Sequence, residues 1–161
     1  MKRTFKILTM KQEKSAGAVI YYYESEAGEP KFLLLQNTLK TTYWEFPKGK
    51  IEGNESVEET VRREVSEETG LRDFEIIQGF KHTLHWFFKF KGELINKEAV
   101  YLLIRLTSED KDKVKINHEH QEFKWMYLEQ AKKEVKIKAN LELLKKAHEF
   151  ILEFEKQKRL F

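Results

Sequence analysis

The chain has 161 residues, of which 40% are hydrophobic and 13% aromatic, so it is long and apolar enough to form one folded domain over residues 1–161. Cysteine is absent, which excludes disulfides, thiolate metal ligands and a cysteine nucleophile. Thirty Lys and Arg against 27 Asp and Glu give a net charge of +3, which is too balanced for the basic surface that binds duplex nucleic acid.

The apolar segments are too short to cross a membrane. The longest runs are residues 18–23 and 99–104, whereas a spanning helix needs about 20 apolar residues. Residues 1–6 are basic, but neither an apolar core nor a small-residue cleavage site follows, so we predict no signal peptide. We therefore expect a cytoplasmic protein without membrane partners.

The hydrophobic pattern predicts strands, a helix, more strands and a final helix. Because this order lacks the strict strand–helix alternation of a doubly wound fold, it favours an α+β class with a mixed β-sheet between helices. Strands are predicted over residues 15–23, 31–36, 74–81, 83–91, 98–106 and 123–127, and helices over residues 57–69 and 140–158.

Local signals set several of these boundaries. The first two strands form a hairpin, and residues 37–47 are predicted to be a loop. Ser56 is placed to cap the first helix with Glu59 as its capping-box partner, and Gly70 to end it. Gly92 marks a turn between two strands. In the last helix, one apolar stripe is predicted from Leu141, Leu144, Ala147, His148, Ile151 and Leu152.

The helix over residues 57–69 has an unusual distribution of acids. At about 100° per residue, Glu64 and Glu68 point within about 20° of Val57, the start of the apolar stripe, and Glu67 lies about 80° to one side. Three carboxylates are thus expected on or beside the buried face, where like charges repel and water is scarce. Glu67 and Glu68 also lie at the end of the helix that disfavours negative charge.

A bound divalent cation would remove these penalties, because carboxylate-rich sites suit Mg²⁺ or Mn²⁺. The competing interpretation is a solvated helix face with ion pairs four residues apart. Glu58 and Glu59, with Arg62 and Arg63 nearby, fit that interpretation. Glu64, Glu67 and Glu68 do not, since the valine stripe determines which face is buried.

The same segment resembles the motif of the Nudix hydrolases: Gly, five residues, Glu, seven residues, Arg-Glu, an aliphatic, any residue, Glu-Glu, any residue, Gly, an aliphatic. The matching residues are Gly49, Glu55, Arg63, Glu64, Val65, Glu67, Glu68, Gly70 and Leu71, with no departure. The resemblance implies Mg²⁺- or Mn²⁺-dependent hydrolysis of a nucleoside diphosphate linked to another group, with water as the nucleophile.

The resemblance also implies roles for individual residues. Glu64, Glu67 and Glu68 match metal-ligand positions, and the carbonyl of Gly49 matches a backbone ligand. Arg63, together with Glu55, matches the pair that orients the carboxylates. We therefore expect Glu64, Glu68 and Arg63 in the catalytic machinery.

Segments outside the motif are similar to the diadenosine tetraphosphate hydrolase branch of the family. In this branch, Glu119 matches an acid that serves as a further metal ligand or general base. Lys48 and Lys97 match lysines that bind the polyphosphate, with Lys81 a weaker addition. The similar segments are residues 15–18 (SAGA), 32–36 (FLLLQ), 44–49 (WEFPKG), 79–81 (GFK), 118–121 (HEHQ) and 123–125 (FKW).

The nucleobase needs a stacking partner, for which the candidates are Trp86, Tyr43, Phe87 and Phe88. We expect Trp86 and Tyr43 to bind the substrate. Two positions depart from the animal and plant members, which place His where Tyr43 stands and an aromatic near Ile137. His118 and His120 could bind zinc, but we interpret them as polar loop residues.

The expected function is hydrolysis of diadenosine tetraphosphate to ATP and AMP by a monomer, with a small nucleotide as its only partner. One alternative is removal of pyrophosphate from RNA bearing a 5′-triphosphate, although the modest charge argues against an extended RNA surface. The other is a nucleotide-sensing Nudix domain without turnover. The intact acids of the motif argue against it.

Overall fold

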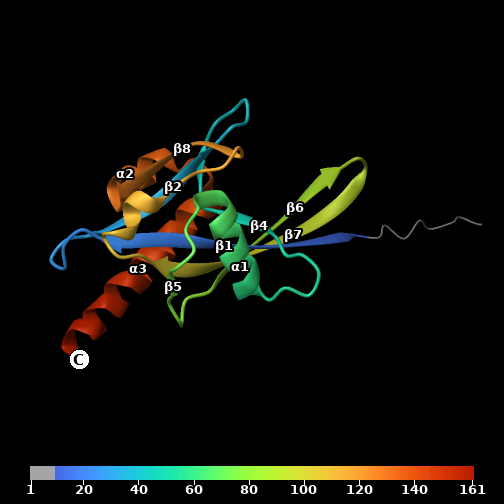
Figure 1. The fold of residues 1–161 in the computed structure, drawn as a ribbon. Coiled ribbons are helices and arrows are strands. Elements are labelled where there is room, and N and C mark those ends of the chain that lie inside the picture. The colour runs from blue at the N-terminus through green and yellow to red at the C-terminus, as the bar shows by residue number, and fades with distance from the viewer. Residues whose placement is uncertain (1–9) are drawn as a thin grey trace, which may run out of the picture.

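The computed structural model describes residues 10–161 (Figure 1). Residues 1–6, for which the sequence predicts no signal peptide, lie outside the described residues. One eight-stranded sheet forms the centre of the fold. Its strands are β1 (Lys11–Tyr23), β2 (Pro30–Asn37), β3 (Trp44–Glu45), β4 (Lys48–Lys50), β5 (Glu75–Ile76), β6 (His82–Phe90), β7 (Glu93–Arg105) and β8 (His120–Tyr127). The helices are α1 (Val57–Thr69), α2 (Leu128–Glu134) and α3 (Lys138–Leu160), with a short 3₁₀ turn at Asp110–Lys113.

The sheet is mixed, as predicted. β1 pairs in parallel with β7 and antiparallel with β2 and β4. β2 also pairs with β3 and β8, and β7 with β5 and β6, all antiparallel. The long hairpin of β6 and β7 extends away from the body of the molecule (Figure 1). Gly92, with φ of 78°, lies in its turn and confirms that prediction.

Helices cover both faces of the sheet, which explains the nearly continuous apolar runs of β1 and β2. α1 and α3 lie on opposite sides of β1 (Figure 1). Alternate residues of β1 face these two sides, so that Tyr21 packs with α3 and Ile20 packs with α1. The α+β class with a sheet between helices is therefore confirmed. Among the described residues, we find no helix with the length and apolarity needed to span a bilayer.

α1 has the predicted bounds and caps. The hydroxyl of Ser56 accepts a hydrogen bond of 3.1 Å from the amide of Glu59. Gly70 adopts a left-handed conformation with φ of 73°, and its amide donates to the carbonyl of Ser66 at 2.9 Å. The start and the end of the helix that holds the acids are thus determined by local sequence.

Three predictions about the fold are wrong. The strand predicted over residues 74–81 contains only Glu75–Ile76, because Gly79 has φ of 97° and the chain turns there. The predicted loop over residues 37–47 contains β3, which pairs with β2. The apolar stripe predicted for α3 includes Leu152, which is 48% exposed, and leaves out Leu143, which is buried. β4 and α2 are too short to show a hydrophobic period in the sequence.

Candidate active site

The acids of α1 lie against β4. Glu64 is 9% exposed and Glu68 is 4% exposed, so both are buried as the helix phase predicts. Glu67 is not: its side chain is 54% exposed, since it lies at the edge of the buried face. α1 therefore presents two buried carboxylates and one carboxylate at their rim.

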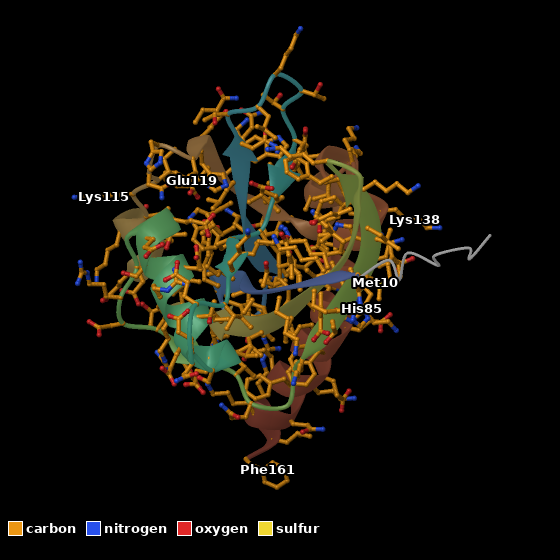
Figure 2. The ribbon with its side chains drawn as sticks, turned by 90° about the vertical axis from the view of Figure 1, so that its right-hand side faces the viewer. Met10, His85, Lys115, Glu119, Lys138 and Phe161 are labelled. Atoms are coloured by element: carbon orange, nitrogen blue, oxygen red, sulfur yellow. The ribbon has the colours of Figure 1, made fainter. Side chains whose placement is uncertain are left out.

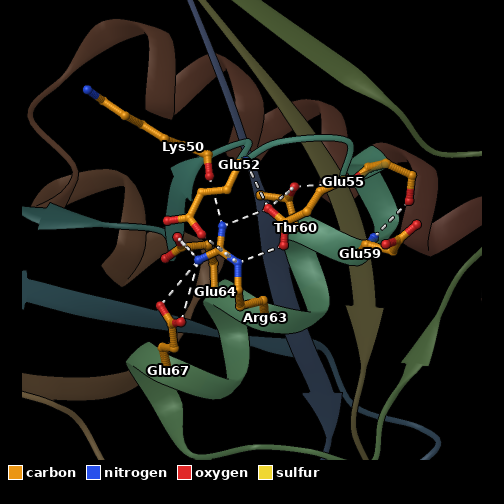
Figure 3. Close-up of polar contacts among 9 residues, drawn as sticks. Lys50, Glu52, Glu55, Glu59, Thr60, Arg63, Glu64 and Glu67 are labelled. Atoms are coloured by element: carbon orange, nitrogen blue, oxygen red, sulfur yellow. Dashed lines mark hydrogen bonds and ion pairs between the residues drawn. The ribbon is translucent and has the colours of Figure 1, made fainter.

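Arg63 holds this group together (Figure 3). Its guanidinium donates two hydrogen bonds to the carboxylate of Glu55, at 2.8 and 2.9 Å, and a third of 2.7 Å to Glu64. It also donates to the carbonyl of Lys50 at 2.9 Å and lies 3.4 Å from Glu67. The hydrogen bonds from Arg63 are the main reason that the pKa of Glu55 falls to about 2. The planar guanidinium thus aligns carboxylates from α1 and from the loop before it.

Gly49 makes room for Glu64. A Cβ atom at this position would lie 2.0 Å from the carboxyl carbon of Glu64, which is much closer than any allowed contact. Only glycine lets β4 approach α1 so closely. The first residue of the motif therefore has a steric role in addition to the backbone-ligand role that the resemblance implies.

Burial, together with the charges of Glu64, Glu119 and Glu45, raises the pKa of Glu68 to about 9. Burial also raises the pKa of Glu64, although Arg63 opposes that shift. Oε2 of Glu68 is buried and has no hydrogen-bond partner among the described residues. Buried carboxylates with an unpartnered oxygen fit a divalent cation, which would stabilise their charged forms.

Glu119 and His120 complete this group from the start of β8. One ligand atom each of Glu68, Glu119 and His120 lies within 4.8 Å of the others. Glu119 is exposed on the α1 side of the sheet, whereas His85 of β6 lies on the other side (Figure 2). The interpretation of both histidines as polar loop residues is wrong for His120, which is 5% exposed. It holds for His118, which is exposed.

A cavity of about 390 Å³ lies beside this group, within the size range of small-molecule sites. Tyr43, Lys48 and Trp86, three of the residues expected to bind substrate, line it. Ile137 also lines it, so the position that departs from the animal and plant members does lie at this cavity. The other lining residues are Glu45, Leu84, His85, Tyr101, Ala139 and Asn140.

Two lysines flank the aromatic side of the cavity. The ammonium of Lys48 lies 5.6 Å from the ring centre of Trp86, and that of Lys97 lies 5.5 Å from it. Burial and the charge of Lys97 lower the pKa of Lys48, while Glu45 and Glu68 oppose that shift. Lys48 thus lies between the cavity and the buried carboxylates, where a polyphosphate would supply the missing negative charge.

Lys81 lies elsewhere. It lines a different cavity together with Val57, Glu58 and Gly79, near the start of α1. The structure therefore does not bring it to Lys48 and Trp86. Two buried or partly buried residues of the site, Glu45 and His120, were given no role from the sequence, although both lie within segments that resemble the diadenosine tetraphosphate hydrolase branch.

Comparisons with known proteins identify the family of this chain. A NUDIX domain model matches residues 13–147. The asymmetrical bis(5'-nucleosyl)-tetraphosphatase of Caenorhabditis elegans is 34% identical over 143 residues, which cover 88% of this chain and 98% of that protein. A crystal structure of a C. elegans Ap4A hydrolase binary complex aligns with a TM-score of 0.74 at 34% identity, over 87% of this chain and 98% of that one.

A more distant relative has another activity in its name. The RNA pyrophosphohydrolase of Pseudoalteromonas translucida is 33% identical over 91 residues, which cover 50% of this chain and 52% of that protein. The match to the NUDIX domain model, by contrast, covers most of this chain. The chain therefore belongs to the Nudix family of pyrophosphohydrolases and is similar to the asymmetrical Ap4A hydrolases.

Proposed function

We propose that this protein hydrolyses dinucleoside polyphosphates in the presence of Mg²⁺ or Mn²⁺, and that it converts diadenosine tetraphosphate to ATP and AMP. The observation that carries the proposal is the position of Lys48. Its side chain lines the aromatic cavity and lies near enough to Glu68 for that charge to act on its pKa. A nucleoside in the cavity would direct its phosphates past Lys48 toward Glu64 and Glu68. The similarity to the C. elegans enzyme over 88% of the chain supports the same substrate.

The residues divide into three groups in this proposal. Glu64, Glu67, Glu68, Glu119 and the Gly49 carbonyl would hold the cation, which neutralises charge on the phosphates and activates water. Trp86 and Tyr43 would stack the base, and Lys48 and Lys97 would bind the phosphates. Arg63 would keep Glu64 in place.

In the reaction, the oxygen of a water molecule bonds to a phosphorus at one end of the chain, and the bridging P–O bond breaks. The proton of the water passes to a carboxylate of the group, and the leaving phosphate departs with the bridging oxygen. Little covalent chemistry is required from the protein, so positioning and charge neutralisation supply most of the rate.

The test is a substrate screen with products resolved by chromatography. Diadenosine tetraphosphate, other dinucleoside polyphosphates, ADP-ribose, NADH, dNTPs and triphosphorylated RNA are compared. We expect Glu68→Gln to lower turnover on the preferred substrate by at least about 100-fold, while the exposed control Glu58→Gln keeps it. Near wild-type turnover by Glu68→Gln at saturating Mg²⁺ would remove Glu68 from the proposal.

The RNA pyrophosphohydrolase relative supports a second candidate, removal of pyrophosphate from triphosphorylated RNA. Salt separates the two, because a protein that contacts many phosphates loses affinity steeply as salt rises. With a net charge of +3, we expect a shallow dependence. A steep decline of kcat/KM between 50 and 200 mM salt, together with faster turnover of RNA, would favour the second candidate.

A further inference from the structure

His120 is a buried group beside the carboxylates that the proposed function leaves without a role. Its side chain is 2% exposed, and Nε2 lies 2.9 Å from Oε1 of Glu45. Nδ1 is buried and has no hydrogen-bond partner among the described residues. An unpartnered buried ring nitrogen is costly, so its orientation toward the carboxylates needs a reason.

The contact with Glu45 determines which nitrogen of the His120 ring carries the proton. A carboxylate oxygen accepts hydrogen bonds, so Nε2 donates and Nδ1 is left with a free lone pair. In protein metal sites, a histidine ligand commonly donates its second ring nitrogen to a carboxylate in this way, which fixes the ring and its tautomer. Glu45 and His120 reproduce that arrangement with the free nitrogen directed at the acids of α1.

The distances agree with one shared ion. Nδ1 of His120 lies 3.9 Å from Oε1 of Glu68, too far for a hydrogen bond. Two ligands held about 2.1 Å from one octahedral ion lie about 3 Å apart when adjacent and about 4.2 Å apart when opposite. The separation of 3.9 Å is closer to that of opposite ligands, and Oε2 of Glu68 is also buried without a hydrogen-bond partner in the part of the chain that the structure describes.

We propose that Nδ1 of His120 is a nitrogen ligand of the divalent cation, held in place by Glu45. The cation site then combines one imidazole nitrogen with the carboxylate oxygens of Glu68 and Glu119. Because imidazole suits transition metals better than Mg²⁺, this site binds Mn²⁺ in preference to Mg²⁺. The inference rests on the cation site of the proposed function and adds a ligand that the motif does not contain.

Bound Mn²⁺ provides a direct test, since its electron spin echo is modulated by a coordinated ¹⁴N nucleus. We expect nitrogen modulation in the wild-type protein loaded with one equivalent of Mn²⁺. It persists in His118→Gln, which changes the exposed neighbouring histidine, and disappears in His120→Gln. Circular dichroism and thermal unfolding establish that both variants fold.

A second variant leaves His120 itself intact. In Glu45→Gln the nitrogen modulation persists, but the Kd for Mn²⁺ rises roughly 10-fold to 100-fold, as is typical when the partner of a histidine ligand is removed. In His120→Gln the preference for Mn²⁺ over Mg²⁺ shrinks, as measured by calorimetric titration of both ions.

The outcomes separate the two proposals. If Mn²⁺ binds and the wild-type protein shows no nitrogen modulation, His120 is not a ligand, while the proposed function stands. Modulation that survives in His120→Gln also overturns the inference. If Mn²⁺ does not bind at all, the cation site and the proposed function fail together.

Discussion

Removing the metal should make the protein lose stability as the pH rises. Burial, together with the neighbouring acids, raises the pKa of Glu68 to about 9, whereas an unfolded glutamate titrates near 4.5. Between these values the folded protein holds a proton that the unfolded chain has released. Unfolding is therefore favoured by rising pH, and the stabilisation present below about pH 4.5 is progressively lost toward pH 9.

The size of the expected loss in unfolding free energy follows from the one proton that the folded protein binds and the unfolded chain does not. A difference of one bound proton changes the free energy of unfolding by about 1.4 kcal/mol per pH unit. From pH 6 to pH 8 we therefore expect a loss of about 3 kcal/mol, or roughly 6–12 °C in Tm for a chain of this length. Glu64, whose pKa is also raised, acts in the same direction. His148, whose pKa burial lowers, opposes the slope near and below pH 6.5.

The assay is urea unfolding in EDTA at several pH values, for the wild-type protein, Glu68→Gln and the exposed control Glu67→Gln. Subtracting the Glu68→Gln slope from the wild-type slope cancels the contribution of His148. We expect this difference to approach 1.4 kcal/mol per pH unit, with Glu67→Gln close to wild type. Excess Mg²⁺ should abolish most of the difference, because it stabilises the charged carboxylates. Equal slopes in the wild type and Glu68→Gln would refute the reasoning.

Three further predictions concern the substrate and the positioning residues. Trp86→Ala should raise KM for dinucleotides roughly 5-fold to 100-fold with a smaller change in kcat, since stacking is worth about 1–3 kcal/mol per base; unchanged kinetics with lower stability would make Trp86 a core residue only. Gly49→Ala should lower turnover about 100-fold, because the added Cβ would displace the Glu64 carboxylate; steady-state kinetics beside a thermal melt would show whether the fold is retained. Arg63→Lys should lower kcat at least about tenfold, because an ammonium cannot reproduce the bidentate contact with Glu55; wild-type kcat would contradict this.

The elements with strong local signals were predictable from sequence. α1 has a cap, an apolar stripe and a terminating glycine, so its bounds agree with the structure. The runs of β1 and β2 are apolar because both of their faces are covered. The segment before β6 was misassigned because Ile77 and Phe80 are buried in an irregular turn, where burial has no strand period.

From residue spacing alone, without the family resemblance, the site was predictable only where helix phase determines direction. Glu64 and Glu68 share a face with Val61, so their burial follows from spacing. The burial of His120 depends on pairing between β8 and β2, which are far apart in sequence. Lys81 and Lys97 look alike in sequence, yet only Lys97 lies opposite Trp86 across the β6–β7 pair. Tertiary pairing, rather than residue type, decides which lysine reaches the ring.

β4 contributes neighbouring residues to the stacking cavity and to the carboxylate group. Successive side chains of a strand point to opposite faces, so Lys48 lies toward Trp86 while Gly49 lies against Glu64. The pairing with β1 holds this register, since Gly17 opposes Lys48 and Ala16 opposes Gly49. Gly17 is itself required, because a Cβ there would lie 2.4 Å from the carbonyl oxygen of Pro47. The separation between the stacking cavity and the carboxylates is therefore set by one peptide unit, and a one-residue slip of β4 would exchange the faces of both residues.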